Sequence, residues 1–300
     1  MIVSAYLLVP MKKGVTSWQF YARRFARVVP PFLVFMVLYS TLPLLWGQLD
    51  AATSMKDLSR LLLNFPTMAG HLWFIYPLIS LYLFIPVISP WLSSASAREE
   101  RFFIGLFLLS TCIPFLNRWC GEVWGQCFWN EYHMLWYFSG FLGYLVLAHY
   151  IRVHLTWSRK RRFVVGAIAM IVGAFLTIYS FYTQAVPGIV HSTPVIELGW
   201  AFCTINCVVL TAGTFLMFSC IEKDSAPAIV TDMSKMSYGM YLMHMFYLVP
   251  ITQFFINGDT ANPILPIWLT IPLATLLCYV CCYITSKLIS YLPGSKYLIG

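Results

Sequence analysis

Long apolar runs separated by short polar segments dominate the chain. A helix needs about 20 apolar residues to cross a hydrocarbon core of roughly 30 Å, at a rise of 1.5 Å per residue. Prolines inside the runs predict kinks that neighbouring helices accommodate. The runs predict eight membrane-spanning helices, near residues 31–49, 72–92, 102–117, 132–150, 163–183, 198–220, 236–256 and 264–290. We therefore predict an all-α fold, a polytopic transmembrane helical bundle.

The first residues, MIVSAYLLVP, are apolar but too few to cross a membrane. Ten helical residues rise only about 15 Å, which is half of the hydrocarbon core. The segment also lacks the basic head and cleavage site of a signal peptide. It is either the inner half of a truncated span or a short re-entrant segment. We favour the first alternative and expect about nine spans here, with the true beginning of the protein missing.

Composition and charge agree with a membrane protein and orient it. The chain is 60% hydrophobic and only 10% charged, which excludes a soluble domain of 300 residues. If residues 11–29 are cytoplasmic, sixteen of the 19 lysines and arginines face the inner side, and only Lys56, Arg60 and Arg118 face the outer side. The net charge of +8 then reflects anchoring to an anionic inner leaflet, not nucleic-acid binding. We expect a multi-pass protein of a cell membrane, such as the bacterial inner membrane.

Three arginines stand just before Pro30 and Pro31, in the stretch YARRFARVVPP. Arg23, Arg24 and Arg27 are typical of the cytoplasmic end of a span, and from charge alone they set topology. Guanidinium forks also pair with phosphate oxygens bidentately. The same arginines therefore suit a phosphorylated ligand, and both interpretations stay open at this point.

Four stretches occur in order over most of the chain. They are SAYLL (Ser4–Leu8), RFARVVPP (Arg24–Pro31), GHLWFIYPLISLYLFIP (Gly70–Pro86) and MSYGMYLMH (Met236–His244). Each is only moderately specific alone. Together they resemble the acyltransferase-3 family of integral membrane acyltransferases, which includes many bacterial polysaccharide O-acetyltransferases. The family elements are S-G-x-L, R-x-x-R before an apolar residue and Pro, H-L-W-F, and S-Y-G-x-Y-L-x-H, and Ala5 stands where the first has Gly.

The resemblance implies a single transmembrane acyltransferase domain over residues 1–300. It implies acetyl-CoA or another acyl-CoA as donor, a glycan or lipid-linked sugar as acceptor, membrane lipids as surroundings, and no metal. Family members have ten spans, and the first carries an Arg and the His that is the proposed catalytic base. No position of this sequence corresponds to that His. We expect that a helix is missing, which leaves the activity of the chain as it stands in question.

His244, His71 and Tyr241 are the catalytic candidates. His244 lies nine residues beyond Lys235, about 13 Å into the membrane, where an ionisable group is costly unless satisfied inside the protein. A neutral imidazole that bonds a neighbouring helix is the alternative. Tyr241 either bonds the substrate or packs, and His71 either faces water or lines the acyl-transfer cavity. The resemblance favours supporting roles for the two histidines.

The resemblance also assigns the two sides of the reaction. Arg24 and Arg27 lie three apart on one helix face and correspond to the family's acyl-donor side, which suits the phosphates of coenzyme A. Trp73 is either an interfacial anchor or part of the acyl-transfer cavity. The outer loop 117–133 holds three tryptophans, which suit a sugar but are equally typical of a membrane interface. Polar acceptor-binding candidates from this and the next outer loop are Glu122, Glu131, His133, His191 and Glu197.

The cysteines indicate little chemistry. Cys120 and Cys127 form a disulfide only if their loop faces an oxidising compartment. Cys278, Cys281 and Cys282 fall in a span with no His or Asp nearby in the sequence, so we interpret them as small packing residues and not as a metal site.

Two other functions remain open. A transporter or flippase for a glycan or lipid intermediate often shows paired repeats, which are not evident here. A non-catalytic membrane partner of a glycan-assembly complex is the third. The preferred prediction is a membrane O-acyltransferase, most simply an O-acetyltransferase that modifies a polysaccharide.

Overall fold

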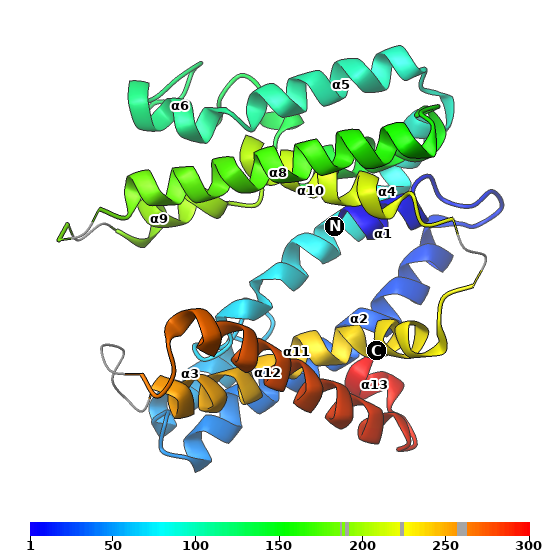
Figure 1. Cartoon of the computed structure of the whole chain (residues 1–300). Helices are drawn as coiled ribbons and strands as arrows, with labels where there is room; N and C mark the ends of the chain where they lie inside the picture. Colours follow the sequence, from blue (N-terminus) through cyan, green and yellow to red (C-terminus); the bar gives the residue numbers. More distant parts are fainter. Residues whose placement is uncertain (187, 190–191, 223–224, 257–262) are drawn as a thin grey trace. The chain divides into compact units, whose positions relative to one another are not determined.

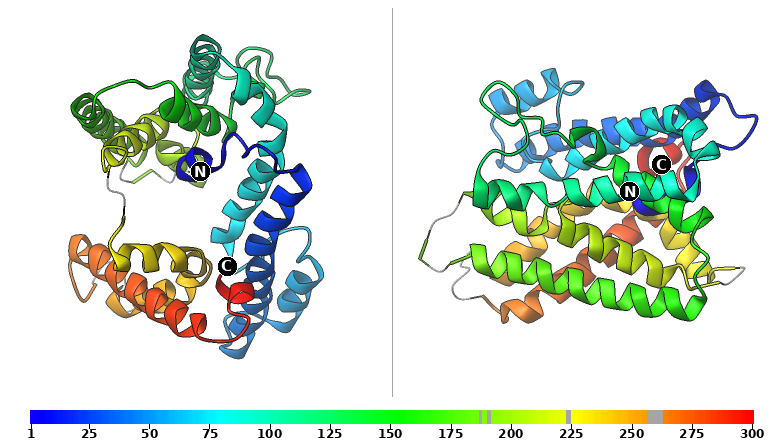
Figure 2. Two further views of the ribbon diagram at one scale, coloured as in Figure 1. Left: turned by 90° about the vertical axis from the view of Figure 1, so that its right-hand side faces the viewer. Right: turned by 90° about the horizontal axis from the view of Figure 1, so that it is seen from above.

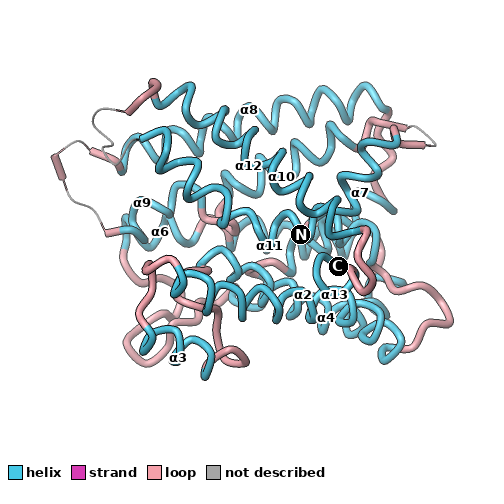
Figure 3. Tube along the Cα trace, turned by 90° about the horizontal axis from the view of Figure 1, so that it is seen from below, coloured by secondary structure: helices cyan, strands magenta, loops and turns pink. Residues whose placement is uncertain are grey.

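The structure is a computed structural model (Figure 1). It describes residues 1–186, 188–189, 192–222, 225–256 and 263–300. These residues form helices and loops, and they contain no β-strand (Figure 3). A single isolated bridge joins Cys127 to Asn130. The all-α prediction is confirmed.

Within the described residues, seven helical segments are long and apolar enough to cross a membrane. They match seven of the nine expected spans and make the chain a multi-pass membrane protein. Their bounds are Ser17–Leu45, Gly70–Ser94, Ala97–Cys120, Arg159–Gln184, Thr193–Phe218, Ala228–Ile256 and Ile267–Ser290.

The other two expected spans are short helices. The first residues form α1 (Ile2–Leu8), and the run 132–150 yields α7 (Leu142–Val153), preceded by the 3-10 turn η2 (Trp136–Phe138). Gly140 has a φ of 75°, a conformation that interrupts a helix and separates η2 from α7. The 12 residues of α7 rise about 18 Å, less than a hydrocarbon core.

Helix α2 (Ser17–Leu45) begins well before the predicted start near residue 31. A capping box fixes its first turn, because the Thr16 hydroxyl accepts from Gln19 N and the Gln19 amide oxygen accepts from Thr16 N, both at 3.2 Å. The helix continues through Pro30 and Pro31. The arginines before these prolines therefore lie on the helix, as their common helix face requires.

The chain forms two compact units, each built from two segments. Unit 1 comprises Met1–Gly14 and Leu83–Lys223, and unit 2 comprises Val15–Tyr82 and Asp224–Gly300. Helix α4 (Ile75–Ser94) contributes residues to both. The expectation of one domain over residues 1–300 stays a prediction.

Further elements of unit 1 are α5 (Ala97–Ser110), α6 (Ile113–Cys120), α8 (Arg159–Gln184), α9 (Thr193–Glu197), η3 (Leu198–Trp200) and α10 (Ile205–Phe218). Helices α8 and α10 lie side by side (Figure 2). A Cβ atom on Gly173 would lie 2.4 Å from the nitrogen of Leu210, and one on Gly213 would lie 2.4 Å from the nitrogen of Met170. The glycines therefore allow the close backbone approach that packs helices in membranes.

Helix α1 is attached to α7 by Arg152. The guanidinium donates to the carbonyl oxygens of Tyr6 and Val9, which lie at the C-terminal end of α1. The Met11 nitrogen donates to the Ser89 hydroxyl at 3.0 Å. These bonds satisfy backbone groups at and beyond the end of a short helix, which otherwise lack partners.

Unit 2 contains α2, α3 (Ala51–Ser59), η1 (Gly70–Phe74), α11 (Ala228–Ile256), α12 (Ile267–Ser290) and α13 (Lys296–Ile299). Helices α11 and α12 pack against each other (Figure 1). The Tyr238 hydroxyl donates to Val28 O at 2.8 Å, and a Cβ on Gly239 would lie 2.6 Å from Cβ of Ile299. The Tyr-Gly pair of MSYGMYLMH therefore joins α11 to α2 and α13.

Candidate active site

His71 and His244 lie against each other in unit 2. Their ring centroids are 4.7 Å apart, at an interplanar angle of 76°. His71 comes from η1 and His244 from the middle of α11. The Tyr241 hydroxyl donates to the backbone oxygen of His71. The fold thus joins the stretches Gly70–Pro86 and Met236–His244, and it brings the three catalytic candidates together.

The hydrogen bonds of the two imidazoles assign their tautomers. His244 Nδ1 is 2.6 Å from Tyr241 O, and a carbonyl only accepts, so Nδ1 carries the proton. The neutral ring then has its lone pair on Nε2. His71 Nε2 lies 3.4 Å from Leu242 O, while His71 Nδ1 is buried without a hydrogen-bond partner. Each ring therefore has one nitrogen that accepts no hydrogen bond from the described residues.

Tyr39 of α2 completes this group and was not predicted. It is 2% exposed, and its hydroxyl donates to Leu242 O at 3.1 Å. Its ring centroid lies 5.1 Å from that of His71, and the ring stacks on Phe246 at 4.0 Å. Leu242 O thus faces both Tyr39 and His71. In the sequence Tyr39 is one aromatic residue among many in an apolar run, and no motif distinguishes it.

A pocket of about 400 Å³ lies between α11 and α12. Tyr241 and His244 line it from α11, and Thr275, Cys278 and Cys282 line it from α12. The Cys278 thiol is 3.5 Å from His244 O and 4.0 Å from the sulfur of Cys282. Both cysteines are free and buried, as expected for packing residues. We expected no His near them, however, and α11 brings His244 beside Cys278.

Arg24 and Arg27 lie on the N-terminal half of α2. Arg24 is half-buried, with its guanidinium carbon 5.7 Å from the centroid of the Phe20 ring, and Arg27 is exposed. The Arg23 Nε donates to Gln19 O at 3.1 Å. Among the ion pairs of the described residues, none involves Arg24 or Arg27. No carboxylate in these ion pairs matches their charge. Both guanidiniums could therefore pair with a phosphate.

The acceptor candidates fall in both units. Trp73 is half-buried in unit 2, and its ring centroid is 6.0 Å from that of Phe74. Glu122, Glu131 and Glu197 are exposed in unit 1. His191 lies outside the described residues. Trp73 lies two residues after His71, in the same 3-10 helix η1.

His133 is buried and hydrogen-bonded to the backbone. It is 8% exposed, and its Nδ1 accepts a hydrogen bond from Leu135 N at 3.2 Å, which fixes the turn before η2. Burial lowers the pKa of His133, so the ring is neutral near pH 7. His133 therefore helps to fix the backbone before η2, and its role in acceptor binding stays a prediction.

The disulfide alternative for the outer loop is not observed. Cys120 and Cys127 are both exposed free thiols. The loop aromatics are largely exposed, with Phe128 at 89% and Trp129 at 88%. Such a surface matches either interpretation of the loop, an interfacial belt or a sugar-stacking platform.

The seven apolar helices of the described residues define a multi-pass membrane protein. The family model of the acyltransferase-3 acyltransferase domain matches residues 1–287. The chain therefore belongs to this family and is a membrane acyltransferase, which transfers groups other than aminoacyl groups. The resemblance seen in the four stretches is confirmed. No curated protein and no solved structure matches the chain.

Proposed function

We propose that the protein transfers an acetyl group from acetyl-CoA to a sugar hydroxyl of a lipid-linked or surface polysaccharide. The observation that carries the proposal is the His71–His244 pair, in which each ring has an unoccupied lone pair. His244 also lines the pocket between α11 and α12. Acyl transfer to an alcohol requires a base for the hydroxyl proton, and histidine is the side chain most often used. Family membership favours this enzyme function over a transporter or a non-catalytic partner.

In the proposed reaction, the sugar oxygen attacks the carbonyl carbon of the thioester. Nε2 of His244 takes the hydroxyl proton, and a tetrahedral intermediate forms. Its collapse breaks the carbon–sulfur bond, and coenzyme A leaves as the thiol after the imidazolium returns the proton. Tyr241 is a positioning residue, because its hydroxyl holds the backbone of His71 beside His244. The resemblance implied a supporting role for His244 beside a first-helix His. The proposal makes His244 the base because it lines the pocket, which His71 does not.

The donor side of the proposal rests on Arg24 and Arg27. Their guanidiniums share one face of α2 and pair with no carboxylate in the described part of the chain. Two guanidiniums suit the phosphates of coenzyme A, which a smaller acyl donor lacks. Arg23 is bonded to the backbone of its own helix and provides a neighbouring control.

The test measures acetyl ester on the glycan of cells that express the full-length gene product. The unmodified gene is expected to give acetylated glycan, and deletion of the gene or the variants His71→Ala and His244→Ala are expected to abolish it. The control is Tyr247→Phe. Tyr247 lies on the same helix as His244, and the variant removes its 2.6 Å hydrogen bond to Thr285 of α12. Normal acetylation in the double histidine variant would overturn the proposal. Loss of surface glycan with unchanged acetylation would favour the transporter.

A further inference from the structure

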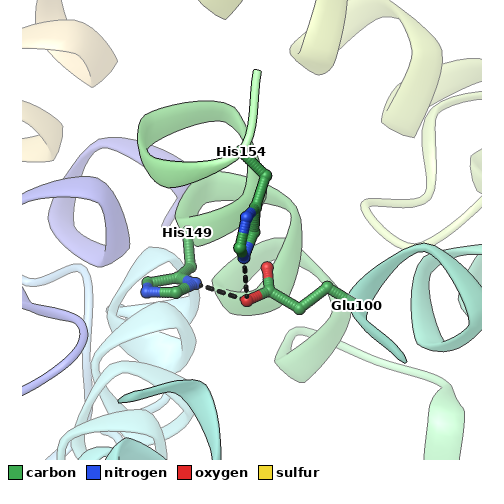
Figure 4. A group of neighbouring side chains, drawn as sticks. All are labelled: Glu100, His149 and His154. Carbon is green, nitrogen blue, oxygen red and sulfur yellow. Dashed lines mark hydrogen bonds and ion pairs between the residues drawn. The ribbon is translucent and has the colours of Figure 1, made fainter. Parts of the chain in front are cut away.

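Unit 1 contains a second group of ionisable side chains, Glu100, His149 and His154 (Figure 4). Glu100 lies in the first turn of α5, His149 lies on α7, and His154 follows α7 directly. His149 Nδ1 is 2.8 Å from Glu100 Oε1, and His154 Nε2 is 3.1 Å from the same oxygen. Both rings converge on one carboxylate oxygen (Figure 4), and the three ligand atoms lie within 4.8 Å of one another.

The carboxylate of Glu100 is buried and incompletely satisfied. The residue is 0% exposed, and its second oxygen, Oε2, has no hydrogen-bond partner. Among the ion pairs of the described residues, Glu100 pairs with the two imidazoles and with no lysine or arginine. A buried carboxylate is costly unless its charge is matched. Neither a lysine nor an arginine offsets the charge of this carboxylate in those ion pairs, and a bound metal cation would offset it.

We propose that Glu100, His149 and His154 bind a divalent transition-metal ion, with zinc as the occupant. Two imidazole nitrogens and one carboxylate oxygen are a zinc ligand set that leaves a fourth position open. Calcium and magnesium prefer oxygen ligands throughout, so the two nitrogens select against them.

The geometry needs an adjustment of all three separations to hold the ion. The ligand atoms lie within 4.8 Å of one another, so the two imidazole nitrogens must also move closer together. Ligand bonds of 2.0–2.2 Å in a tetrahedron separate the ligand atoms by about 3.3 Å. The distances of 2.8 and 3.1 Å to Glu100 Oε1 therefore widen by about half an ångström or less. The His154 side chain is 19% exposed, which gives the ion a route from solvent.

The bound ion would tie α5 to α7. These helices already pack against each other, and α7 holds α1 through Arg152. The ligands belong to unit 1 and the histidine pair to unit 2. The inference is therefore independent of the proposed acyl transfer, and its test does not use activity.

The experiment titrates the purified full-length chain, in detergent and stripped by a chelator, with Co²⁺ as a visible probe and with Zn²⁺ as competitor. One ion per chain and the absorption of four-coordinate cobalt are expected. Glu100→Gln, His149→Gln and His154→Gln, made singly, are each expected to weaken binding by about 10–100-fold or more. His133→Gln removes another buried histidine of unit 1 and is the matched control, with unchanged binding.

Two outcomes would overturn the inference. One is a wild-type chain that binds neither Co²⁺ nor Zn²⁺; the other is binding that all three ligand variants leave intact, which would indicate adventitious surface sites. If a variant fails to fold, the wild-type protein still decides the question. Its stoichiometry must be one, and Zn²⁺ must raise its unfolding temperature by a few degrees, because the ion binds the folded state.

Discussion

The two histidine groups differ in what faces the imidazole nitrogens. In unit 1, nitrogens of His149 and His154 both face a buried carboxylate oxygen. In unit 2, the hydrogen bonds of His71 and His244 within the described part of the chain go to backbone carbonyls. A carboxylate stabilises the charged form of histidine or shares a metal with it, whereas a carbonyl orients a neutral ring and leaves one lone pair available. The comparison supports the proposals of proton transfer in unit 2 and of ion binding in unit 1.

Replacement of the proposed base is expected to have the largest effect. His244→Gln retains an amide that can bond Tyr241 O but has no basic nitrogen, so kcat should fall by about 10²–10⁴-fold with little change in KM for the donor. Purified full-length protein with acetyl-CoA and its glycan acceptor gives both constants. The matched variant His149→Gln should change kcat far less. The reverse ranking would show that the carboxylate-bound histidines carry the chemistry.

Removal of the buried Glu100 carboxylate tests the group in unit 1. Glu100→Ala leaves two imidazoles facing each other without their anion, and it should destabilise the protein by roughly 3 kcal/mol. Thermal unfolding in detergent, without added metal, measures the effect. Glu99→Ala is the control. Glu99 is exposed, and its carboxylate accepts hydrogen bonds from Ser96 in the capping box of α5, which contributes about 1 kcal/mol to stability. Equal losses for the two variants would contradict a charge buried in unit 1.

Changes at the proposed donor-binding arginines should alter KM for acyl-CoA and leave kcat unchanged. Arg24→Gln together with Arg27→Gln removes two guanidiniums from one face of α2, and KM for acyl-CoA should rise about tenfold. Arg23→Gln removes the same charge one residue away and should leave KM within about twofold. High salt should reduce the difference between the variants. A KM that Arg23→Gln raises as much as the pair does would indicate general membrane electrostatics.

Most of the fold could be predicted because the length of an apolar run identifies a membrane-spanning helix. An apolar run of about 20 residues has one stable form in lipid, the helix. Two errors came from local signals. The apolar run predicted a span that begins near residue 31, although the capping box at Thr16 and Gln19 begins α2 much earlier. Gly140 interrupts the run 132–150, so helix α7 begins only at Leu142.

The candidate site was only partly predictable, because contacts between distant segments decide it. Sequence motifs identified His71, Tyr241 and His244 but not which ring nitrogen is unoccupied. The group in unit 1 was missed, since Glu100 and His154 belong to separate helical segments and show no metal-ligand spacing. Only the packing of α5 on α7 makes them neighbours.

The smallest expected effect concerns the aromatic support of the pair in unit 2. Tyr39→Phe keeps the stack on Phe246 and removes the hydroxyl that donates to Leu242 O at 3.1 Å. His71 Nε2 is then left as the side-chain partner of this carbonyl. We expect the free energy of unfolding to fall by about 1 kcal/mol and kcat to fall a few-fold. Tyr39→Leu also removes the stack and should cost more. If Tyr39→Phe instead abolished activity while the fold persisted, the hydroxyl itself would contact the reacting groups. Tyr39 would then be a catalytic residue, and the basic site of unit 2 would extend to α2.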